Sequence, residues 1–372
     1  MKKWFQYLLV ALLSFFAVAC EPVNGIAPEF PVKDKTVLIY MVGNNNLSSN
    51  AESNLADLKK GYVPSDDNLL VYYHTPVQSP LLLQLRTDES GAVVQDTVYR
   101  FPQRNSATAE SLKSALQVTN TMFPANEYGL FLWSHGTGWL PSGHYSKSFG
   151  EENGVEMEIT DMVKAIPFKL SFVVFDACLM GCVEVAYQMK DSVDYVIASP
   201  AEILSMGFPY SKIMRHLYKT PADYISVAQE YYTYYNSMSG QSRSATVSVV
   251  KTSGLANLAA ESKKVFDKYR DNISNLNYDS VQGYYRYNKY WFFDFGDFIK
   301  SIAGEDAAPV IDALEEAVVY KAATPRFLDF AIDPNKYSGL STYIPILPSD
   351  PELDNFYMKF DWNKDTGMIL QQ

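Results

Sequence analysis

The sequence predicts an α/β protein, an α/β/α sandwich in which helices cover both faces of a mostly parallel sheet. Two observations carry this prediction: short, continuous apolar runs recur along the chain, and segments with helical spacing separate them. Strands that are buried on both faces read as continuous apolar runs, and crossover helices make neighbouring strands parallel. With 372 residues, of which 47% are hydrophobic and 20% charged, the chain can form two domains or one large α/β domain, and a disordered or collagen-like chain is excluded.

The first twenty residues have the layout of a secretion signal. Lys2 and Lys3 precede an uncharged, mostly apolar run, residues 4–19, that ends in small residues before Cys20. This run falls just short of the roughly 17 to 25 residues that a membrane-spanning helix needs. The small residues before the cysteine resemble the lipobox of bacterial lipoproteins, so we expect residues 1–19 to be a lipoprotein signal peptide and Cys20 to be lipidated. In the alternative, an ordinary secretory peptide is cut nearby and Cys20 stays a free thiol.

The next segment, residues 20–35, contains prolines and alternating charge, and we expect it to tether the lipid anchor to the folded domain. This arrangement predicts a protein of the cell envelope, anchored to a bacterial membrane and facing the periplasm or the surface. The 31 Lys and Arg residues against 42 Asp and Glu give a net charge of −11. Such a surface repels a phosphate backbone, so nucleic acid is not an expected partner.

The folded domain, residues 36–372, is expected to begin with alternating strands and helices. Strands are expected at residues 37–42, 69–73, 128–133, 171–175 and 193–198, and helices at residues 48–60, 107–122 and 156–166, with a further helix before residue 193. Residues 81–85 and 93–99, which turn residues separate, predict a hairpin inserted into this series.

The second part of the domain is expected to be an elaboration of the first. The core reaches a strand at residues 245–251, and residues 252–372 are expected to form a helical, Tyr-rich elaboration that closes with a strand at residues 341–346. No linker separates the two parts, so both are expected to pack as one domain. The aromatic residues within 284–298 suit carbohydrate binding or a buried core, and their helical spacing favours the core.

Chemistry-bearing side chains follow two of the predicted strands. Ser134 and His135 come after one strand, and Asp176 and Cys178 come after the next. Active sites of open parallel sheets form beyond the carboxyl ends of the strands. The intervening residues suffice for one loop and one crossover helix between neighbouring strands, so we expect the imidazole and the thiol to meet.

A cysteine beside a histidine is the minimal apparatus of nucleophilic acyl transfer, because the imidazole accepts the thiol proton and the thiolate attacks a carbonyl. The N–H groups of Gly136 and Cys178 are candidates for binding the developing oxyanion. A helix is expected to begin just after Cys178, with its positive end stabilising the thiolate. The alternative is a buried cysteine that only packs at a strand end.

The motifs SHGTGW (residues 134–139) and DACLMGCVE (residues 176–184) closely resemble the clostripain family of cysteine peptidases, which belongs with caspases, gingipains and legumains. YMVGNNNL (40–47), SPAEILSMGFPY (199–210) and YSGLSTYIP (337–345) add to the resemblance. It implies a caspase-like fold, a His135/Cys178 dyad, cleavage after basic residues, self-cleavage, and calcium dependence in some members. The chain has no calcium-loop spacing, so no cofactor and no metal site are expected, with calcium left as an option.

These inferences predict a cysteine endopeptidase that hydrolyses peptide bonds after Arg or Lys through an acyl-enzyme, with proteins or peptides that carry basic residues as substrates. The alternative is a non-catalytic surface lipoprotein that uses a caspase-like fold as a binding module. The chain has no HExxH, G-x-S-x-G, GxGxxG or P-loop motif. Zinc peptidase, α/β-hydrolase, dinucleotide-binding and NTPase functions therefore have no support.

Asp176 is the candidate for substrate recognition. In an extended chain it lies on the same side as Cys178, so its carboxylate is expected beside the bond to be cut, where a substrate Arg or Lys would pair with it. Without that partner the carboxylate raises the pKa of the thiol. The resemblance also implies that this aspartate lies in the specificity pocket. The alternative is that Asp176 caps the following helix.

The polar loop at residues 140–153 suits proteolysis, and Lys147 is its one basic residue. Since the resemblance implies self-processing between the histidine and the cysteine, we expect a cut after Lys147.

Other candidates are weaker. Cys182 is expected one helical turn after Cys178, where packing is favoured over a redox pair. His74 and His144 are rival bases, and His216 is expected to be structural.

Overall fold

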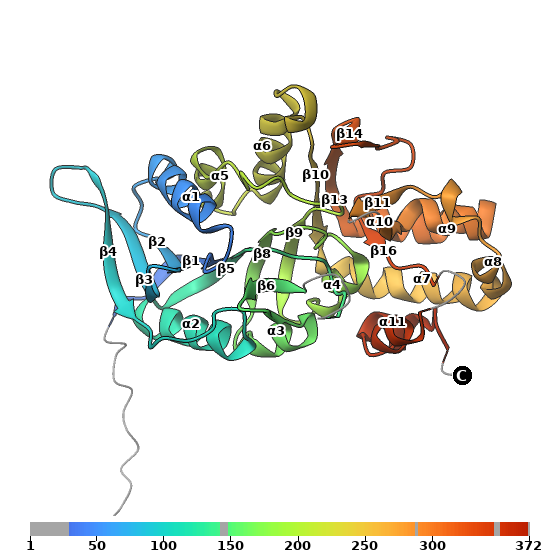
Figure 1. The fold of residues 1–372 in the computed structure, drawn as a ribbon, viewed down its shortest axis with the longest axis horizontal. Helices are drawn as coiled ribbons and strands as arrows, with labels where there is room; N and C mark the ends of the chain where they lie inside the picture. Colours follow the sequence, from blue (N-terminus) through green and yellow to red (C-terminus); the bar gives the residue numbers. More distant parts are fainter. Residues whose placement is uncertain (1–29, 142–147, 287–288, 346–349, 371–372) are drawn as a thin grey trace, which may run out of the picture.

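A nine-stranded sheet forms the core of the computed structural model, which describes residues 30–141, 148–286, 289–345 and 350–370 (Figure 1). The strand order is β13-β10-β9-β8-β5-β1-β2-β3-β4. These strands are β1 (Lys33–Val42), β2 (Asn68–Thr75), β3 (Gln78–Thr87), β4 (Val93–Arg100), β5 (Ala125–Trp133), β8 (Leu170–Asp176), β9 (Val193–Ala198), β10 (Thr246–Lys251) and β13 (Val318–Ala323). The sheet confirms the predicted α/β class.

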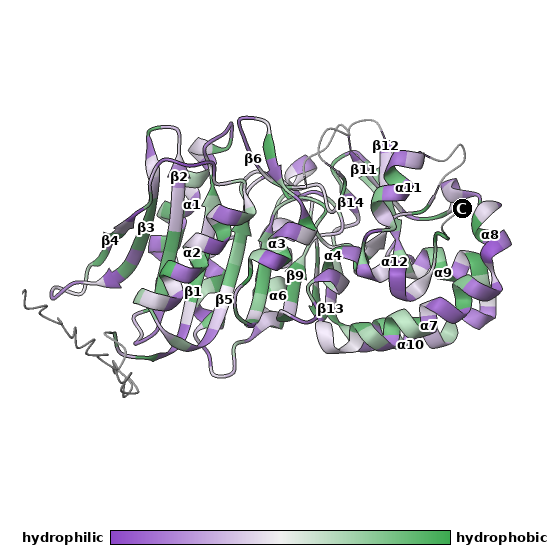
Figure 2. Ribbon diagram, turned by 90° about the horizontal axis from the view of Figure 1, so that it is seen from below, coloured by the Kyte–Doolittle hydropathy of each residue, from purple (hydrophilic) through white to green (hydrophobic). Residues whose placement is uncertain are grey.

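The middle of the sheet is parallel and its edges are antiparallel. Strands β2, β1, β5, β8 and β9 run parallel in that order. The predicted hairpin is β3 and β4, which extends the sheet beyond β2, and β10 and β13 extend it beyond β9. Every residue of β2 is buried, whereas β4 is mostly exposed. Figure 2 shows hydrophobic residues along the inner strands β1 and β5. The prediction of a mostly parallel sheet with continuous apolar strands is confirmed.

Helices cover both faces of this sheet. Figure 1 shows α1 (Ser48–Gly61), α5 (Tyr210–Leu217) and α6 (Tyr224–Asn236) on one face, and α2 (Ala109–Met122) and α3 (Ile159–Ala165) on the other. Because side chains of a strand alternate between faces, Val37, Ile39 and Met41 of β1 join the core under the first group of helices. Leu38 and Tyr40 join the core under the second group.

The C-terminal part packs onto the second of these cores. It contains α7 (Leu255–Lys268), α8 (Arg270–Ser274), α9 (Phe295–Ala303), α10 (Ala308–Ala317), α11 (Pro351–Tyr357) and α12 (Asp361–Thr366). Phe266 of α7, Phe298 of α9 and Trp362 of α12 belong to the same buried cluster as Leu112 of α2. No helix among the described residues is long and apolar enough to span a bilayer.

This part is less helical than predicted. A second sheet contains β11 (Gly283–Arg286), β12 (Lys289–Asp294) and β16 (Ser341–Thr342). The aromatic residues within 284–298 therefore form a hairpin and the start of α9, with Tyr284 and Phe292 buried and Tyr290 exposed. The helix expected from their spacing is wrong, but the expected core is present, since Trp291, Phe292 and Phe293 are buried in succession.

Several predicted boundaries are also corrected. Strand β1 begins at Lys33, inside the expected tether, because Lys33 already pairs with Ala125 of β5. The expected core and elaboration pack directly on one another, since β13 of the elaboration pairs with β10 of the core. A hairpin of β6 (Phe149–Glu152) and β7 (Val155–Met157) was not predicted, and β14 (Arg326–Phe327) pairs with β15 (Phe330–Ala331) in another.

Candidate active site

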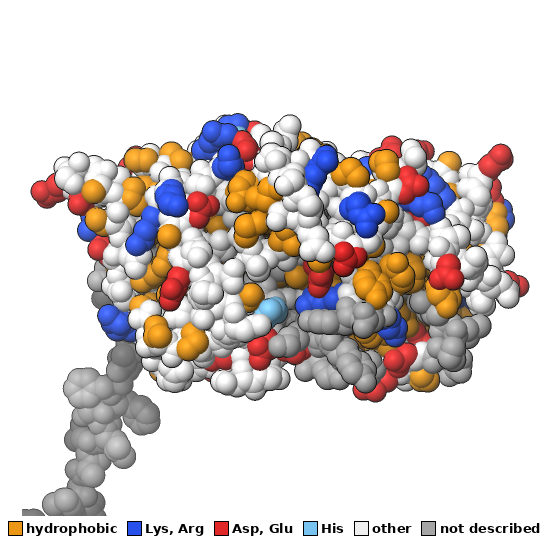
Figure 3. All heavy atoms as spheres, turned by 45° about the horizontal axis from the view of Figure 1, so that its top comes forward, with side chains coloured by type: hydrophobic (Ala, Val, Ile, Leu, Met, Phe, Trp, Pro, Cys, Tyr) orange, Lys and Arg blue, Asp and Glu red, His pale blue; other side chains and the backbone are white. Residues whose placement is uncertain are grey.

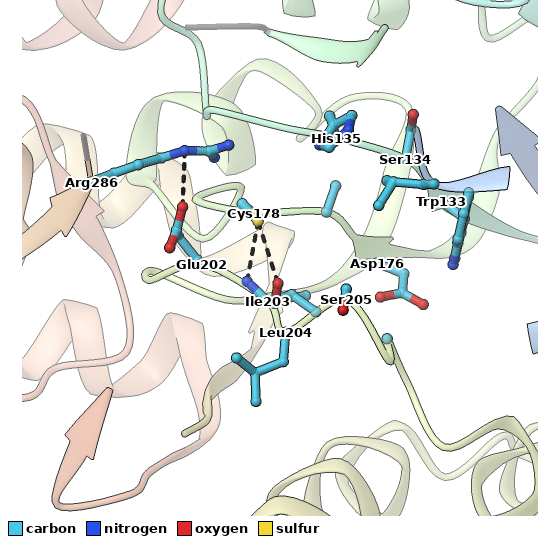
Figure 4. Close-up of a pocket in the computed structure, with 13 residues that line it drawn as sticks. Trp133, Ser134, His135, Asp176, Cys178, Glu202, Ile203, Leu204, Ser205 and Arg286 are labelled. Carbon is cyan, nitrogen blue, oxygen red and sulfur yellow. Dashed lines mark hydrogen bonds and ion pairs between the residues drawn. The ribbon is translucent and has the colours of Figure 1, made fainter. Parts of the chain in front are cut away.

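The two predicted site motifs emerge side by side from the sheet. Strands β5 and β8 are parallel neighbours, and Trp133 pairs with Asp176 where both strands end. His135 and Cys178 follow these positions and line one cavity of about 190 Å³ (Figure 4). In Figure 3 a histidine lies in a hollow of the surface between basic and acidic side chains. The expectation that the imidazole and the thiol share one pocket agrees with this placement.

An asparagine from the loop after β1 holds the imidazole. The His135 Nε2 lies 2.6 Å from the Asn46 Oδ1, so Nε2–H donates this bond and Nδ1 is the basic nitrogen of a neutral ring. The two preceding asparagines fasten the loop to β6. Asn44 donates to the Glu152 carboxylate over 2.8 Å, and Asn45 donates to the Glu151 carbonyl over 2.7 Å. Asn46 was not predicted to take part in the site, although three consecutive asparagines shortly after a buried strand were a usable signal.

The thiol of Cys178 is half-buried and packs against the segment that follows β9. The Ile203 N–H donates to Sγ over 3.3 Å, and the thiol in turn donates to the Ile203 carbonyl over 3.5 Å (Figure 4). Burial raises the pKa of the Cys178 thiol, the Arg286 guanidinium lowers it, and the carboxylates of Glu202 and Asp176 raise it. The predicted effect of Asp176 on the thiol is thus present, although burial is the larger cause.

The predicted helix directly after Cys178 is wrong. Helix α4 (Val183–Gln188) begins later, with Cys182 at its N-cap. The intervening chain pairs with a neighbouring loop instead, since the Leu179 N–H donates to Ala201 and the Gly181 N–H donates to Ser199. The N-terminus of α4 therefore does not directly follow the thiol, and Cys182 does not share a helical face with Cys178.

Gly136 allows the histidine loop to approach the cysteine loop closely. A Cβ at this position would lie 2.9 Å from both the Ala177 Cβ and the Cys178 carbonyl oxygen. The bonds that flank Gly136 join the His135 carbonyl to the Gly150 N–H of β6 and the Thr137 N–H to the carbonyl of Ser148 just before β6, so neither of them engages the Gly136 N–H. Its role in binding an oxyanion, together with the Cys178 N–H, stays a prediction.

Asp176 ends β8 and lines the same cavity. Its Oδ2 accepts hydrogen bonds from the Phe208 N–H at 3.0 Å and from the Tyr210 hydroxyl at 2.8 Å. Burial raises the pKa of this carboxyl to about 6, against the lowering effect of the two hydrogen bonds. The alternative of a cap on the following helix is wrong, because α4 begins beyond Cys182 and both bonds go to the segment around the start of α5.

An ion pair that was not predicted from the sequence borders the thiol. The Nε of Arg286, at the end of β11, lies 2.9 Å from the Glu202 carboxylate, and its Nη1 donates to the Gly136 carbonyl over 2.6 Å. No motif or spacing connects these residues in the sequence, because the C-terminal part of the fold brings Arg286 to the site.

The remaining candidates lie elsewhere. His74 is buried, contacts Ser106 at 2.7 Å and Glu152 at 3.2 Å, and does not line the cavity. His216 is buried beside Glu230, in agreement with a structural role. Cys182 is buried, and the two described cysteines are both free thiols.

Cys20, His144 and Lys147 lie outside the described residues. Within the described ranges, no group of three or more His, Cys, Asp or Glu side chains is placed to hold a metal ion.

The fold and this site define the class of caspase-like cysteine peptidases. The profile of the clostripain family matches residues 39–365, and the chain belongs to that family. Clostripain from Hathewaya histolytica is 27% identical over 218 residues, which cover 48% of this chain. The match spans only 41% of the length of that relative.

Solved structures extend the similarity over most of the chain. An inactive zymogen C11 protease from Parabacteroides distasonis is 36% identical with a TM-score of 0.81, and the match covers 91% of this chain and 99% of that one. A secreted C11 cysteine protease from Bacteroides thetaiotaomicron, in complex with an irreversible peptide inhibitor, is 28% identical with a TM-score of 0.79, over 90% of this chain and 99% of that one. The resemblance inferred from the motifs is confirmed.

Proposed function

We propose that this protein is a cysteine endopeptidase that hydrolyses peptide bonds after Arg or Lys, with His135 and Cys178 as its catalytic dyad. The observation that carries the proposal is one cavity that brings an imidazole, a thiol and a buried carboxylate together. Family membership supports the reaction class, and the solved relative with an irreversible peptide inhibitor supports a peptide ligand.

The site supplies a route for acyl transfer. The basic Nδ1 of His135 accepts the thiol proton, and the Cys178 thiolate attacks the carbonyl carbon of the substrate. The oxyanion that forms is bound by the N–H groups of Gly136 and Cys178. Collapse expels the amine, which takes the proton from the imidazole, and water then hydrolyses the thioester with the same imidazole as base.

Asp176 supplies the preference for basic residues. Its carboxylate lines the cavity, is buried, and has a raised pKa, so a cationic side chain would relieve an unfavourable charge. A cavity of about 190 Å³ is of a size to receive one substrate side chain. Arg is expected to exceed Lys where a bidentate contact to the carboxylate is possible.

Fluorogenic peptides that differ only in the residue before the cut test this function. Arg and Lys peptides are expected to be hydrolysed at least tenfold faster than a Leu peptide, and Cys178→Ala is expected to abolish hydrolysis. Equal rates on all three peptides would refute the specificity, and activity in the Cys178→Ala protein above a mock preparation would refute the mechanism.

Self-processing after Lys147 belongs to the same proposal. The Ser148 hydroxyl donates to the Leu140 carbonyl over 2.8 Å, so both ends of the intervening loop are held together. The two products of a cut are therefore expected to stay associated. Incubated wild-type protein should give two bands on a denaturing gel and one particle by size exclusion, and Cys178→Ala should give one band. A fully active single band would contradict the processing step.

The location and the cofactor need are also proposals. We infer that Cys20 is lipidated and anchors the protein in the cell envelope. More than one acyl chain is expected on it, because a single chain binds a membrane only marginally. Cys20→Ser should move the protein from the detergent phase to the aqueous phase. An unmodified Cys20 thiol in the native protein would refute the assignment.

We also propose that the activity is independent of calcium, which predicts equal activity with and without a chelator. A loss of activity upon chelation would show a calcium requirement.

A further inference from the structure

Arg286 reaches the cavity from outside the main sheet. It ends β11 in the small sheet of the C-terminal part, and its side chain is only 7% exposed. Of the described residues that line the cavity, Arg286 alone carries a permanent positive charge. Figure 4 shows its guanidinium on the side of Cys178 that faces away from Asp176. The cation therefore borders the thiol and is separate from the carboxylate proposed to bind the substrate.

The contacts of Arg286 join the two loops that flank the thiol. Its Nη1 donates to the carbonyl of Gly136, which directly follows His135. Its Nε pairs with Glu202, which directly precedes Ile203, the residue whose N–H donates to Sγ. One side chain thus ties the loop of the histidine to the loop that holds the sulfur.

The charges around the thiol make this cation consequential. The titratable and charged groups that face the Cys178 thiol are His135 after β5, Asp176 of β8, Glu202 after β9, Tyr231 of α6 and Arg286 of β11. Burial and both carboxylates disfavour the thiolate, and α4 begins too far along the chain, at Val183, to supply a helix N-terminus directly after Cys178. An opposite charge nearby is what a buried thiolate requires.

We propose that Arg286 is a positioning residue of the reaction, which stabilises the Cys178 thiolate by its charge and fixes the His135–Gly136 segment through its fork, while Glu202 holds the guanidinium in place. The inference rests on the proposed function, because it assigns Cys178 as the nucleophile. It also gives the C-terminal part of the fold a role in the site.

The test measures the thiol without using hydrolysis. The rate of Cys178 alkylation by iodoacetamide is followed against pH, and fragment-ion mass spectrometry separates Cys178 from the buried Cys182. Arg286→Met is expected to raise the midpoint of the profile by about one pH unit, so that roughly tenfold less thiolate is present below it. Glu202→Gln removes an anion and is expected to lower the midpoint. Arg86→Met, in an exposed ion pair with Asp96, is the matched control and should leave it unchanged.

Arg286→Lys separates charge from geometry. The lysine keeps the positive charge, so the midpoint stays near the wild-type value. A lysine cannot donate to the Gly136 carbonyl and stay paired with Glu202 at the same time, as the wider guanidinium does, so kcat falls while KM changes little. Rescue of the midpoint without rescue of kcat supports both halves of the proposal.

Opposite shifts in Arg286→Met and Glu202→Gln are a signature that loss of folding cannot produce. Shifts of the same sign, or no shift in either variant, would overturn the inference. Opposite shifts in a protein that hydrolyses no peptide would leave the role of Arg286 standing and refute the proposed function instead.

Discussion

Replacing Asp176 by Asn should stabilise the fold while removing the preference for basic substrates. The carboxyl has a pKa of about 6 in the folded protein because it is buried, against about 3.9 in an unfolded chain. The unfolded state therefore releases its proton first as pH rises, and the folded state loses stability between about pH 4 and pH 6. This difference of about two pKa units lowers the free energy of unfolding by about 3 kcal/mol at pH 7.

Asn removes this cost without losing the hydrogen bonds. Both bonds end on Oδ2 of Asp176, and an amide oxygen can accept from the Phe208 N–H and the Tyr210 hydroxyl alike. Urea unfolding should show Asp176→Asn more stable than wild type by up to about 3 kcal/mol at pH 7, and nearly equal to it at pH 4. Lower stability at pH 7 would refute the reasoning about burial.

Activity should change in the opposite direction. Loss of a charge-assisted hydrogen bond of about 1.5 to 3 kcal/mol should reduce kcat/KM for an Arg peptide roughly tenfold to a hundredfold, with a Leu peptide nearly unaffected. In the wild-type protein the Arg/Leu ratio should fall as pH drops through about 6, because protonation removes the anion. Equal losses on both peptides would make Asp176 a structural residue.

Glu184→Gln is the matched control. Glu184 is also fully buried, its pKa is raised to about 7, and its Oε1 takes the bonds from the Thr342 hydroxyl and the Tyr343 N–H. It does not line the cavity. This variant should likewise gain stability at pH 7 but keep the wild-type Arg/Leu ratio, so that stability and specificity are separated.

Three further substitutions test the dyad and its support. Asn46→Ala should lower kcat roughly tenfold to a hundredfold with little change in KM, because the imidazole is kept but loses its orientation; steady-state kinetics showing an unchanged kcat would exclude the role. Gly136→Ala should cost about 1 to 3 kcal/mol in urea unfolding and also reduce activity, since its Cβ would contact the Cys178 carbonyl; wild-type stability would contradict the close packing. His135→Ala should abolish hydrolysis with a wild-type circular dichroism spectrum, and residual turnover would point to another base.

The sequence predicts the strands of the central sheet well because each strand can be recognised from its own short stretch of residues. Continuous apolar runs mark the strands that helices bury on both faces, and the ends of β5 and β8 place His135 and Cys178 at one edge of the sheet. The dyad pocket could be predicted from the positions of the strand ends, together with the expectation that these two strands are neighbours in the sheet.

The missed features depend on tertiary contacts. Leu179 and the residues after it are apolar enough for a helix, but their backbone bonds to the loop after β9. Strand β6 is too short to show a period, although it anchors Asn44 and Asn45. Arg286 is one of many charged residues in the C-terminal part, and only the fold shows that its guanidinium borders the thiol.

Covalent capture tests the central claim most directly. A biotinylated peptide that ends in lysine and carries a thiol-reactive ketone is incubated with the protein, beside a peptide identical except for a terminal leucine. Mass spectrometry then locates the adduct. The account predicts an adduct on Cys178 with the lysine peptide, much slower labelling with the leucine peptide, and none in Cys178→Ala or His135→Ala. Equal labelling by the two peptides, or an adduct on Cys182 instead of Cys178, would contradict it.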